Sequence, residues 1–145
     1  MKSNSTRLIA LILILSAFFT YEAAATYVPP DSPDASAYIS SYSAIVLNGG
    51  SGKLKVEFSV YGTNTMTKIG ATVIRLYKSN GTYVTSVWYT DSGRSGMMGS
   101  NKAYHFDTET INVSPGSYYA KVTVYAKNAS GSDDIVVTTG IKTIT

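Results

Sequence analysis

The segment KLKVEFSVY, residues 53–61, alternates polar and apolar side chains over its whole length. A period of two predicts a β-strand with one face in a core and the other in water. The segment SYYAKVTVYAK, residues 117–127, repeats the pattern, with Val122 and Val124 on one side and Lys121 on the other. Neither segment has helical periodicity, so the two together predict an all-β protein.

Further strands are predicted on both sides of these two segments. Residues 69–78 and 82–90 are rich in β-branched and aromatic residues and are joined by Ser79-Asn80-Gly81, a strong hairpin signal. Residues 38–47, 103–113 and 135–145 complete a set of seven predicted strands. This number in a chain of about 110 residues predicts a single immunoglobulin-like β-sandwich of about seven antiparallel strands over residues 38–145.

The alternation also predicts which side chains form the core. We expect one core between two sheets that contains Leu54, Phe58, Tyr104, Phe106, Val122 and Val124. This choice places His105, Asp107 and Glu109 on a solvated strand face. Because Ile111 and Val113 share their parity, a bulge near residues 108–110 is needed to return the chain to the core. Either face of residues 82–90 could be the inner one, and a core position is the default interpretation for Trp88, the single tryptophan.

The first 25 residues have the pattern of a secretory signal peptide. Lys2 and Arg7 precede an apolar run, LIALILILSAFF, which is shorter than the roughly 20 residues of a membrane span, and three alanines follow at residues 23–25. Residues 26–37, TYVPPDSPDASA, hold three of the four prolines and predict an extended leader. We therefore expect an extracellular protein that is freely released and has no membrane span after cleavage.

Charge and cysteine content exclude several classes of partner and chemistry. Removing residues 1–25 takes away Lys2, Arg7 and Glu22, so the remaining balance is close to neutral. Since no run of lysine or arginine would neutralise a row of phosphates, nucleic acid is not expected as a partner. The chain has no cysteine, which excludes a disulfide scaffold and thiolate chemistry.

Three segments together carry a resemblance to a known family. They are GTNTMTKIGATVIRLY (62–77), SGMMGSNKAYH (95–105) and SYYAKVTVYAKNASGSD (117–133), in this order behind the signal peptide. With them the chain resembles a family of small secreted β-proteins from Gram-positive anaerobic bacteria, described as a domain of unknown function. The resemblance covers roughly residues 38–139. It implies a secreted bacterial β-domain and carries over no catalytic residue.

The connection at residues 91–102 is the first candidate site. It is long for a sandwich, and loops of this length are often functional. Met97 and Met98 are too apolar for both to remain in water, so we expect one to close the open end of the core and the other to lie at the surface near Arg94. One histidine and no cysteine are too few ligands for a soft-metal site, so no metal or other cofactor is expected.

The second candidate site is a sheet face that carries surplus tyrosines. Tyr119, Lys121 and Tyr125 have outward parity in residues 117–127. Cross-strand pairing that stabilises the sheet is the first interpretation of such tyrosines, and binding of a protein or a glycan by flat aromatic rings with hydroxyl groups is the second. No pattern of a nucleophile with a base, or of a phosphate-binding loop, is present. The sequence therefore predicts a non-enzymatic extracellular interaction protein. The alternatives are a carbohydrate-binding module with exposed tyrosines, or a self-assembling subunit that pairs through an edge strand.

Overall fold

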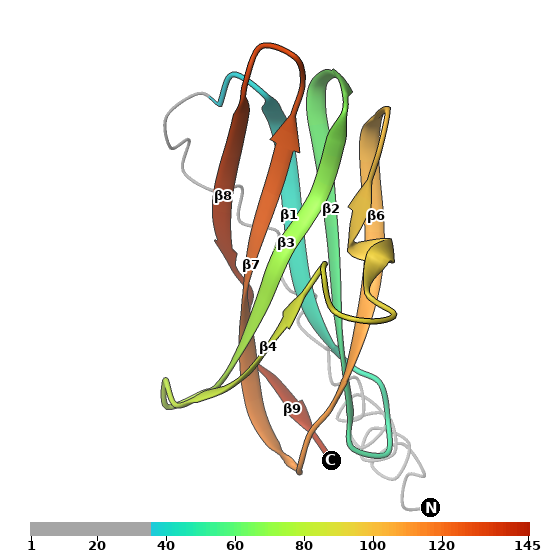
Figure 1. Ribbon diagram of the computed structural model, residues 1–145. Coiled ribbons are helices and arrows are strands. Elements are labelled where there is room, and N and C mark those ends of the chain that lie inside the picture. Colours follow the sequence, from blue (N-terminus) through green and yellow to red (C-terminus); the bar gives the residue numbers. More distant parts are fainter. Residues whose placement is uncertain (1–35) are drawn as a thin grey trace, which may run out of the picture. The chain divides into compact units, whose positions relative to one another are not determined.

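The computed structural model describes residues 36–145, in which the regular structure is β-strand apart from one short 3-10 helix (Figure 1). The all-β prediction is confirmed. The predicted signal peptide and residues 26–35 of the leader lie outside the described residues. The elements are β1 (Ile39–Asn48), β2 (Lys53–Met66), β3 (Lys68–Lys78), β4 (Tyr83–Trp88), η2 (Ser95–Met97), β5 (Met98–Gly99), β6 (Lys102–Asn112), β7 (Gly116–Lys127), β8 (Ser132–Thr138) and β9 (Lys142–Ile144).

The strands form two antiparallel sheets that pack as a sandwich (Figure 1). The smaller sheet has the order β1-β2-β6, and the larger has the order β4-β3-β7-β8, with β5 on β3 and β9 on β7. The predicted final strand is divided into β8 and β9, and the regular pairing of β8 with β7 ends at Thr139. Its backbone N–H donates to the carbonyl oxygen of Ala120 over 2.9 Å, and its hydroxyl oxygen accepts from the Ala120 N–H over 2.9 Å.

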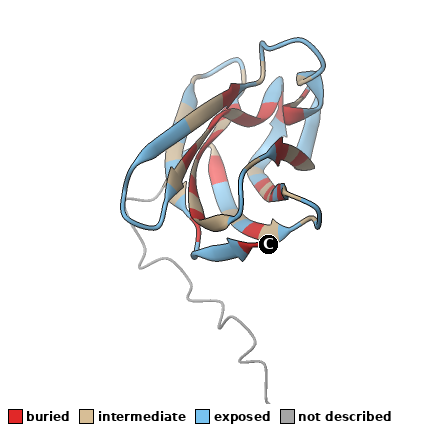
Figure 2. Cartoon of the chain, turned by 90° about the horizontal axis from the view of Figure 1, so that it is seen from below, coloured by how far each residue is buried: buried red, intermediate tan, exposed pale blue. Residues whose placement is uncertain are grey.

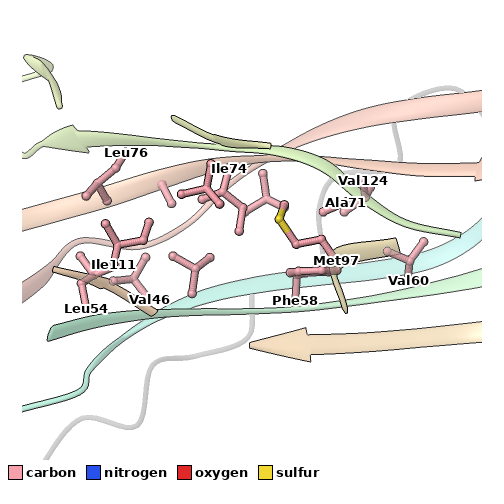
Figure 3. Close-up of a cluster of buried hydrophobic side chains, with 14 of the residues drawn as sticks. Val46, Leu54, Phe58, Val60, Ala71, Ile74, Leu76, Met97, Ile111 and Val124 are labelled. Atoms are coloured by element: carbon pink, nitrogen blue, oxygen red, sulfur yellow. The ribbon is translucent and has the colours of Figure 1, made fainter. Parts of the chain in front are cut away.

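The core lies between the sheets and uses the inward members of each alternating strand. Figure 2 shows buried and exposed positions succeeding one another along the strands. Leu54, Phe58, Val122 and Val124 are buried as predicted. They pack with Ile74 and Leu76 of β3, and Figure 3 shows side chains from both sheets meeting in this layer.

The prediction for β6 is wrong, because its two faces are reversed. Tyr104 and Phe106 are 41% and 51% exposed, whereas His105 and Glu109 are buried and Asp107 is half-buried. The pairing of β6 with β2 runs without interruption from Asn112 to Tyr104, so the expected bulge near residues 108–110 is absent. With His105 and Glu109 inside, Ile111 already has inward parity and no correction of register is needed.

Trp88 takes the outer face, not the core position that was its default interpretation. Its neighbour Val87 enters the core, and Trp88, 43% exposed, lies on the outer face of the larger sheet opposite Val73. Val73 is buried although it is outside the core cluster, which indicates that side chains on this outer face cover it.

Two turns show how the sequence fixes the connections. In the hairpin between β3 and β4, Gly81 has a φ of +86° and donates its N–H to the carbonyl oxygen of Lys78, so the predicted hairpin is confirmed. Before β7, the Tyr118 hydroxyl donates to the carbonyl oxygen of Ser114 over 2.7 Å. This bond satisfies the polar end of a buried ring and holds the turn from β6 against the core.

Candidate functional site

The loop between β4 and β6 is anchored by a buried methionine. Met97, at the end of η2, is fully buried, and Figure 3 places its side chain between the two sheets close to Phe58. Met98 is half-buried in β5, where it pairs with Gly70 of β3. The prediction that one methionine of the pair closes the core is confirmed, and that residue is Met97.

Two inward polar side chains of β6 hold the same loop. His105 Nε2 donates to the carbonyl oxygen of Gly96 over 2.7 Å, and its ring lies 6.2 Å from that of Phe58 between centroids. Glu109 forms an ion pair with Arg94, whose guanidinium also donates to the carbonyl oxygen of Thr110 over 3.4 Å. His105 and Glu109 therefore find their polar partners in the loop.

Glycines allow this close approach of loop and sheet. A Cβ atom on Gly70 would lie 2.1 Å from the carbonyl oxygen of Met97, and one on Gly99 would lie 2.7 Å from Nδ1 of His105. Both contacts are shorter than any real side chain permits, so only glycine fits at either position. The loop is consequently built into the sandwich, and Arg94 and Met97 act in that construction.

The titration of Glu109 reflects its surroundings. Burial raises the pKa of Glu109 above its ordinary value of 4.5, the nearby Arg94 guanidinium acts in the opposite direction, and Asp107 adds to the increase. Because burial is the largest of these effects, the pKa of Glu109 is raised even though the Arg94 guanidinium lowers it.

The outer face of the larger sheet carries the strongest candidate surface, which we call the aromatic–basic face. It consists of Arg75, Tyr77, Tyr83, Trp88, Tyr119 and Lys121. In the register of the sheet these residues form adjacent rows across β4, β3 and β7, with Tyr77 paired to both Tyr83 and Tyr119 and Arg75 paired to Lys121. The uncharged partners Ser86, Thr123 and Thr138 complete these rows.

The side chains of the aromatic–basic face support one another. Tyr77 stacks on Tyr119 with 5.3 Å between centroids and 13° between planes, and Tyr83 meets Tyr77 edge-on at 5.8 Å. The Arg75 guanidinium lies 5.5 Å from the Trp88 ring, and Nζ of Lys121 lies 5.5 Å from the Tyr77 ring. Cation–π contacts of this kind favour conformers that keep the two positive charges over the aromatic rings.

The predicted site residues thus divide into separate places. Tyr119 and Lys121 belong to the aromatic–basic face, and their outward parity agrees with the prediction. Tyr125 has the same parity but lies farther along β7, where it pairs with Gly70 and Asp134. Arg94, Met97 and Met98 belong to the loop. Arg75 and Trp88 were not predicted as site residues. The pairing of β3 with β4 places the Arg75 guanidinium over the Trp88 ring on the outer face of the sheet.

A smaller aromatic group lies on the outer face of the other sheet, and it was not predicted as a group because Tyr104 and Phe106 were expected in the core. Tyr61 and Tyr104 are cross-strand partners with 4.3 Å between ring centroids, and Phe106 follows on the same outer face. Partial burial, together with the neighbouring Tyr61, raises the pKa of the Tyr104 hydroxyl. Phe106 pairs with Ser59, and the Ser59 hydroxyl lies 2.8 Å from the Ser43 hydroxyl. The three aromatic residues and the two serines beside them carry no charge.

Neither a metal-binding cluster nor a related protein of known function identifies a role for these surfaces. Within residues 36–145 no cluster of three histidine, cysteine, aspartate or glutamate residues is placed to bind a metal ion. The same part of the chain contains no helix with the length and apolar character needed to cross a membrane. Comparison with models of known protein families and with curated proteins finds no match.

Proposed function

We propose that the protein is a secreted, non-enzymatic extracellular interaction protein that binds its partner through the aromatic–basic face. The observation that carries this proposal is the arrangement of Arg75 and Lys121 as adjacent cross-strand partners, with tyrosine and tryptophan on both sides and no acidic residue among them. Tyrosine, tryptophan and arginine are the residues that contribute most to binding in protein interfaces.

The charge of the face selects the kind of partner. Two fixed positive charges in a rigid sheet favour an acidic protein segment, because the charges lose little side-chain freedom on binding. The stacked tyrosines provide a flat, amphipathic surface around them. We therefore infer an acidic extracellular polypeptide as the partner.

A carbohydrate partner is the second candidate, supported by the exposure of Tyr83 and Trp88 on the same face. Both rings have surface available for stacking on a sugar. Tyr77 and Tyr119 stack on each other, so the sides by which they touch are closed to a ligand. A glycan would consequently rely on Tyr83 and Trp88 rather than on the tyrosine pair or the two cations.

Binding measurements with matched variants distinguish these functions. The probes are polyglutamate, as an acidic polypeptide, and a neutral soluble glucan. Replacing Arg75 and Lys121 together by Gln should abolish binding of polyglutamate, and added salt should weaken the wild-type interaction. Replacing Lys53 and Lys55 together by Gln on the smaller sheet changes the net charge equally and should have no effect. Equal losses in both double variants would refute a specific face, and glucan binding that depends on Trp88 would assign the carbohydrate function.

The finer fold class and the compartment are part of the same proposal. Orders β1-β2-β6 and β4-β3-β7-β8 correspond to A-B-E and C′-C-F-G of an immunoglobulin-like sandwich. The Tyr118 hydroxyl, bonded to the backbone four residues earlier, matches the tyrosine corner of such domains. Secretion rests on the pattern of residues 1–25 and is tested by finding the processed chain in the culture medium.

A further inference from the structure

The outer face of the larger sheet is ordered in rows of side chains that cross its strands. Strands β4, β3, β7 and β8 lie side by side (Figure 1), and side chains of outward parity recur at every second residue along each strand. Successive rows are therefore about 6.6 Å apart, at about 3.3 Å per residue. An extended polypeptide that lies along these strands has the same spacing between side chains two positions apart, so each of these side chains meets one row.

Three consecutive rows differ in chemistry. In order from the hairpin between β3 and β4, they are an aromatic row of Tyr83, Tyr77 and Tyr119, a cationic row of Ser86, Arg75, Lys121 and Thr138, and an apolar row of Trp88, Val73, Thr123 and Val136. The two positive charges of the cationic row consequently lie between two rows that carry no charge.

The apolar row extends the aromatic–basic face to β8. Val73 and Thr123, at the centre of this row, are only 2% and 9% exposed. At its two ends, Trp88 and Val136 are 43% and 55% exposed. The centre of the row is therefore a packed floor, and the ends offer apolar surface to a ligand that already contacts the cationic row.

The charges beyond the apolar row belong to a different part of the face. The next row contains Tyr125 and the exposed Asp134, and Lys127 follows, paired with Lys68. Lys127 is six residues from Lys121, which is about 20 Å along the strand. A single acidic residue bound at the cationic row does not reach these charges, so its immediate surroundings are the aromatic and apolar rows.

We propose that the aromatic–basic face selects an extended acidic segment in which one glutamate or aspartate has an apolar side chain at the second position on each side. The carboxylate lies over Arg75 and Lys121. One apolar side chain packs on the tyrosine rings of the aromatic row, and the other packs between Trp88 and Val136. Because this pattern is symmetrical, it fits the face in either chain direction.

The two kinds of contact contribute in different ways. The cations attract the carboxylate and set its position along the sheet. Burial of apolar surface in the two neighbouring rows adds affinity only when the apolar side chains have the spacing of the rows. This inference rests on the function proposed above, and it specifies the pattern of side chains that the acidic partner carries.

Two synthetic peptides of identical composition test the spacing. In the probe, one glutamate has valine at the second position on each side, with serine at the other positions and both ends blocked. In the control, the two valines directly adjoin the glutamate. Adjacent side chains of an extended segment point to opposite faces, so the control cannot place its valines and its glutamate on the sheet together. The fluorescence of Trp88, the single tryptophan, reports binding of either peptide.

The probe should bind at least about tenfold more tightly than the control. Polyglutamate separates failure of this inference from failure of the proposed function. If polyglutamate binds and the two peptides bind equally, the face recognises charge alone and the inferred pattern is wrong. If polyglutamate and both peptides fail to bind, the proposed function fails as well.

Matched variants test the apolar row. Val136→Ser removes apolar surface at an exposed position of β8 and should weaken binding of the probe about fivefold. Ile45→Ser makes a similar change on the outer face of the smaller sheet, where Ile45 is 49% exposed, and should leave binding unchanged. Unchanged binding in Val136→Ser, or equal losses in both variants, would refute a contribution of the apolar row.

Discussion

Strands β6 and β7 alternate with equal regularity but turn different kinds of side chain toward the core. Strand β7 buries Ala120, Val122 and Val124, which need only apolar neighbours. Strand β6 buries His105 and Glu109 and exposes aromatic rings on its outer face. The difference shows that a polar side chain belongs in a core when another part of the chain supplies its hydrogen-bond partner, here the loop between β4 and β6.

The loop and β6 therefore depend on each other. Gly96 accepts from His105, Arg94 pairs with Glu109, and Met97 fills the space beside Phe58. The inward residues Ala120, Val122 and Val124 of β7 need no such partnership, because their side chains are apolar. Substitutions that act through the loop should consequently affect β6 and leave β7 intact.

Phenylalanine truncations give the largest expected contrast. Phe58→Ala removes a buried ring and should lower the free energy of unfolding by about 3–5 kcal/mol, while Phe106→Ala removes an exposed ring and should change it by less than about 0.5 kcal/mol. Urea unfolding of both variants measures the difference. A large loss from Phe106→Ala would show that β6 turns its other face inward.

Methionine substitutions test the loop itself. Met97→Ser places a hydroxyl in a fully buried apolar site and should cost about 3 kcal/mol, whereas Met98→Ser should cost less than about 1 kcal/mol because Met98 is only half-buried. Thermal unfolding followed by near-UV circular dichroism reports both. Equal effects would contradict the anchoring role of Met97.

The alternation in the sequence predicted burial correctly where the apolar side chains of a strand are the buried ones. Leu54, Phe58, Val122 and Val124 are in the core as expected, since each lies on an apolar face of a regular alternation. On β6 the two largest apolar side chains, Tyr104 and Phe106, lie outside. Their placement depends on contacts of His105 and Glu109 with residues of the loop nine and fifteen positions earlier in the chain, at Gly96 and Arg94.

The aromatic–basic face shows the same limit. Outward parity of Tyr119 and Lys121 followed from the alternation of residues 117–127. Their neighbours Arg75 and Trp88 come from other strands, and Trp88 was expected in the core. The hairpin turn sets the register between β3 and β4, but no local pattern specifies the register between β3 and β7, which brings Arg75 beside Lys121.

Breaking the Arg94–Glu109 pair should have an intermediate effect that depends on pH. Arg94→Gln leaves the Glu109 carboxylate buried without its cation and should cost about 2 kcal/mol at neutral pH. Because burial raises the pKa of Glu109, the folded protein keeps the Glu109 carboxyl protonated to a higher pH than the unfolded chain does. Protonation of Glu109 therefore adds to the free energy of unfolding at low pH, and this contribution is lost as the pH rises from about 4.5. Arg94→Gln raises the pKa further, so its cost should shrink at acid pH.

A double variant supplies the control. Glu109→Gln removes the buried charge and should restore most of the stability lost in Arg94→Gln, because a neutral amide needs no cation. Urea midpoints of the wild type, both single variants and the double variant, at neutral and acid pH, complete the cycle. Additive costs, or a cost of Arg94→Gln that is independent of pH, would show that the two side chains act separately.

The smallest expected effect concerns metals. His105 Nε2 is engaged as a donor to Gly96, and Nδ1 faces Gly99 so closely that a Cβ atom there would lie 2.7 Å from it. Neither nitrogen of the ring can reach a metal without opening the loop, which would also withdraw Met97 from the core. Addition of copper or of a chelator should therefore leave the melting temperature unchanged in both the wild type and His105→Gln. A copper-dependent rise in the wild type that is lost in His105→Gln would show that the loop opens to form a thioether and imidazole site, and that its link to β6 is weaker than the buried contacts indicate.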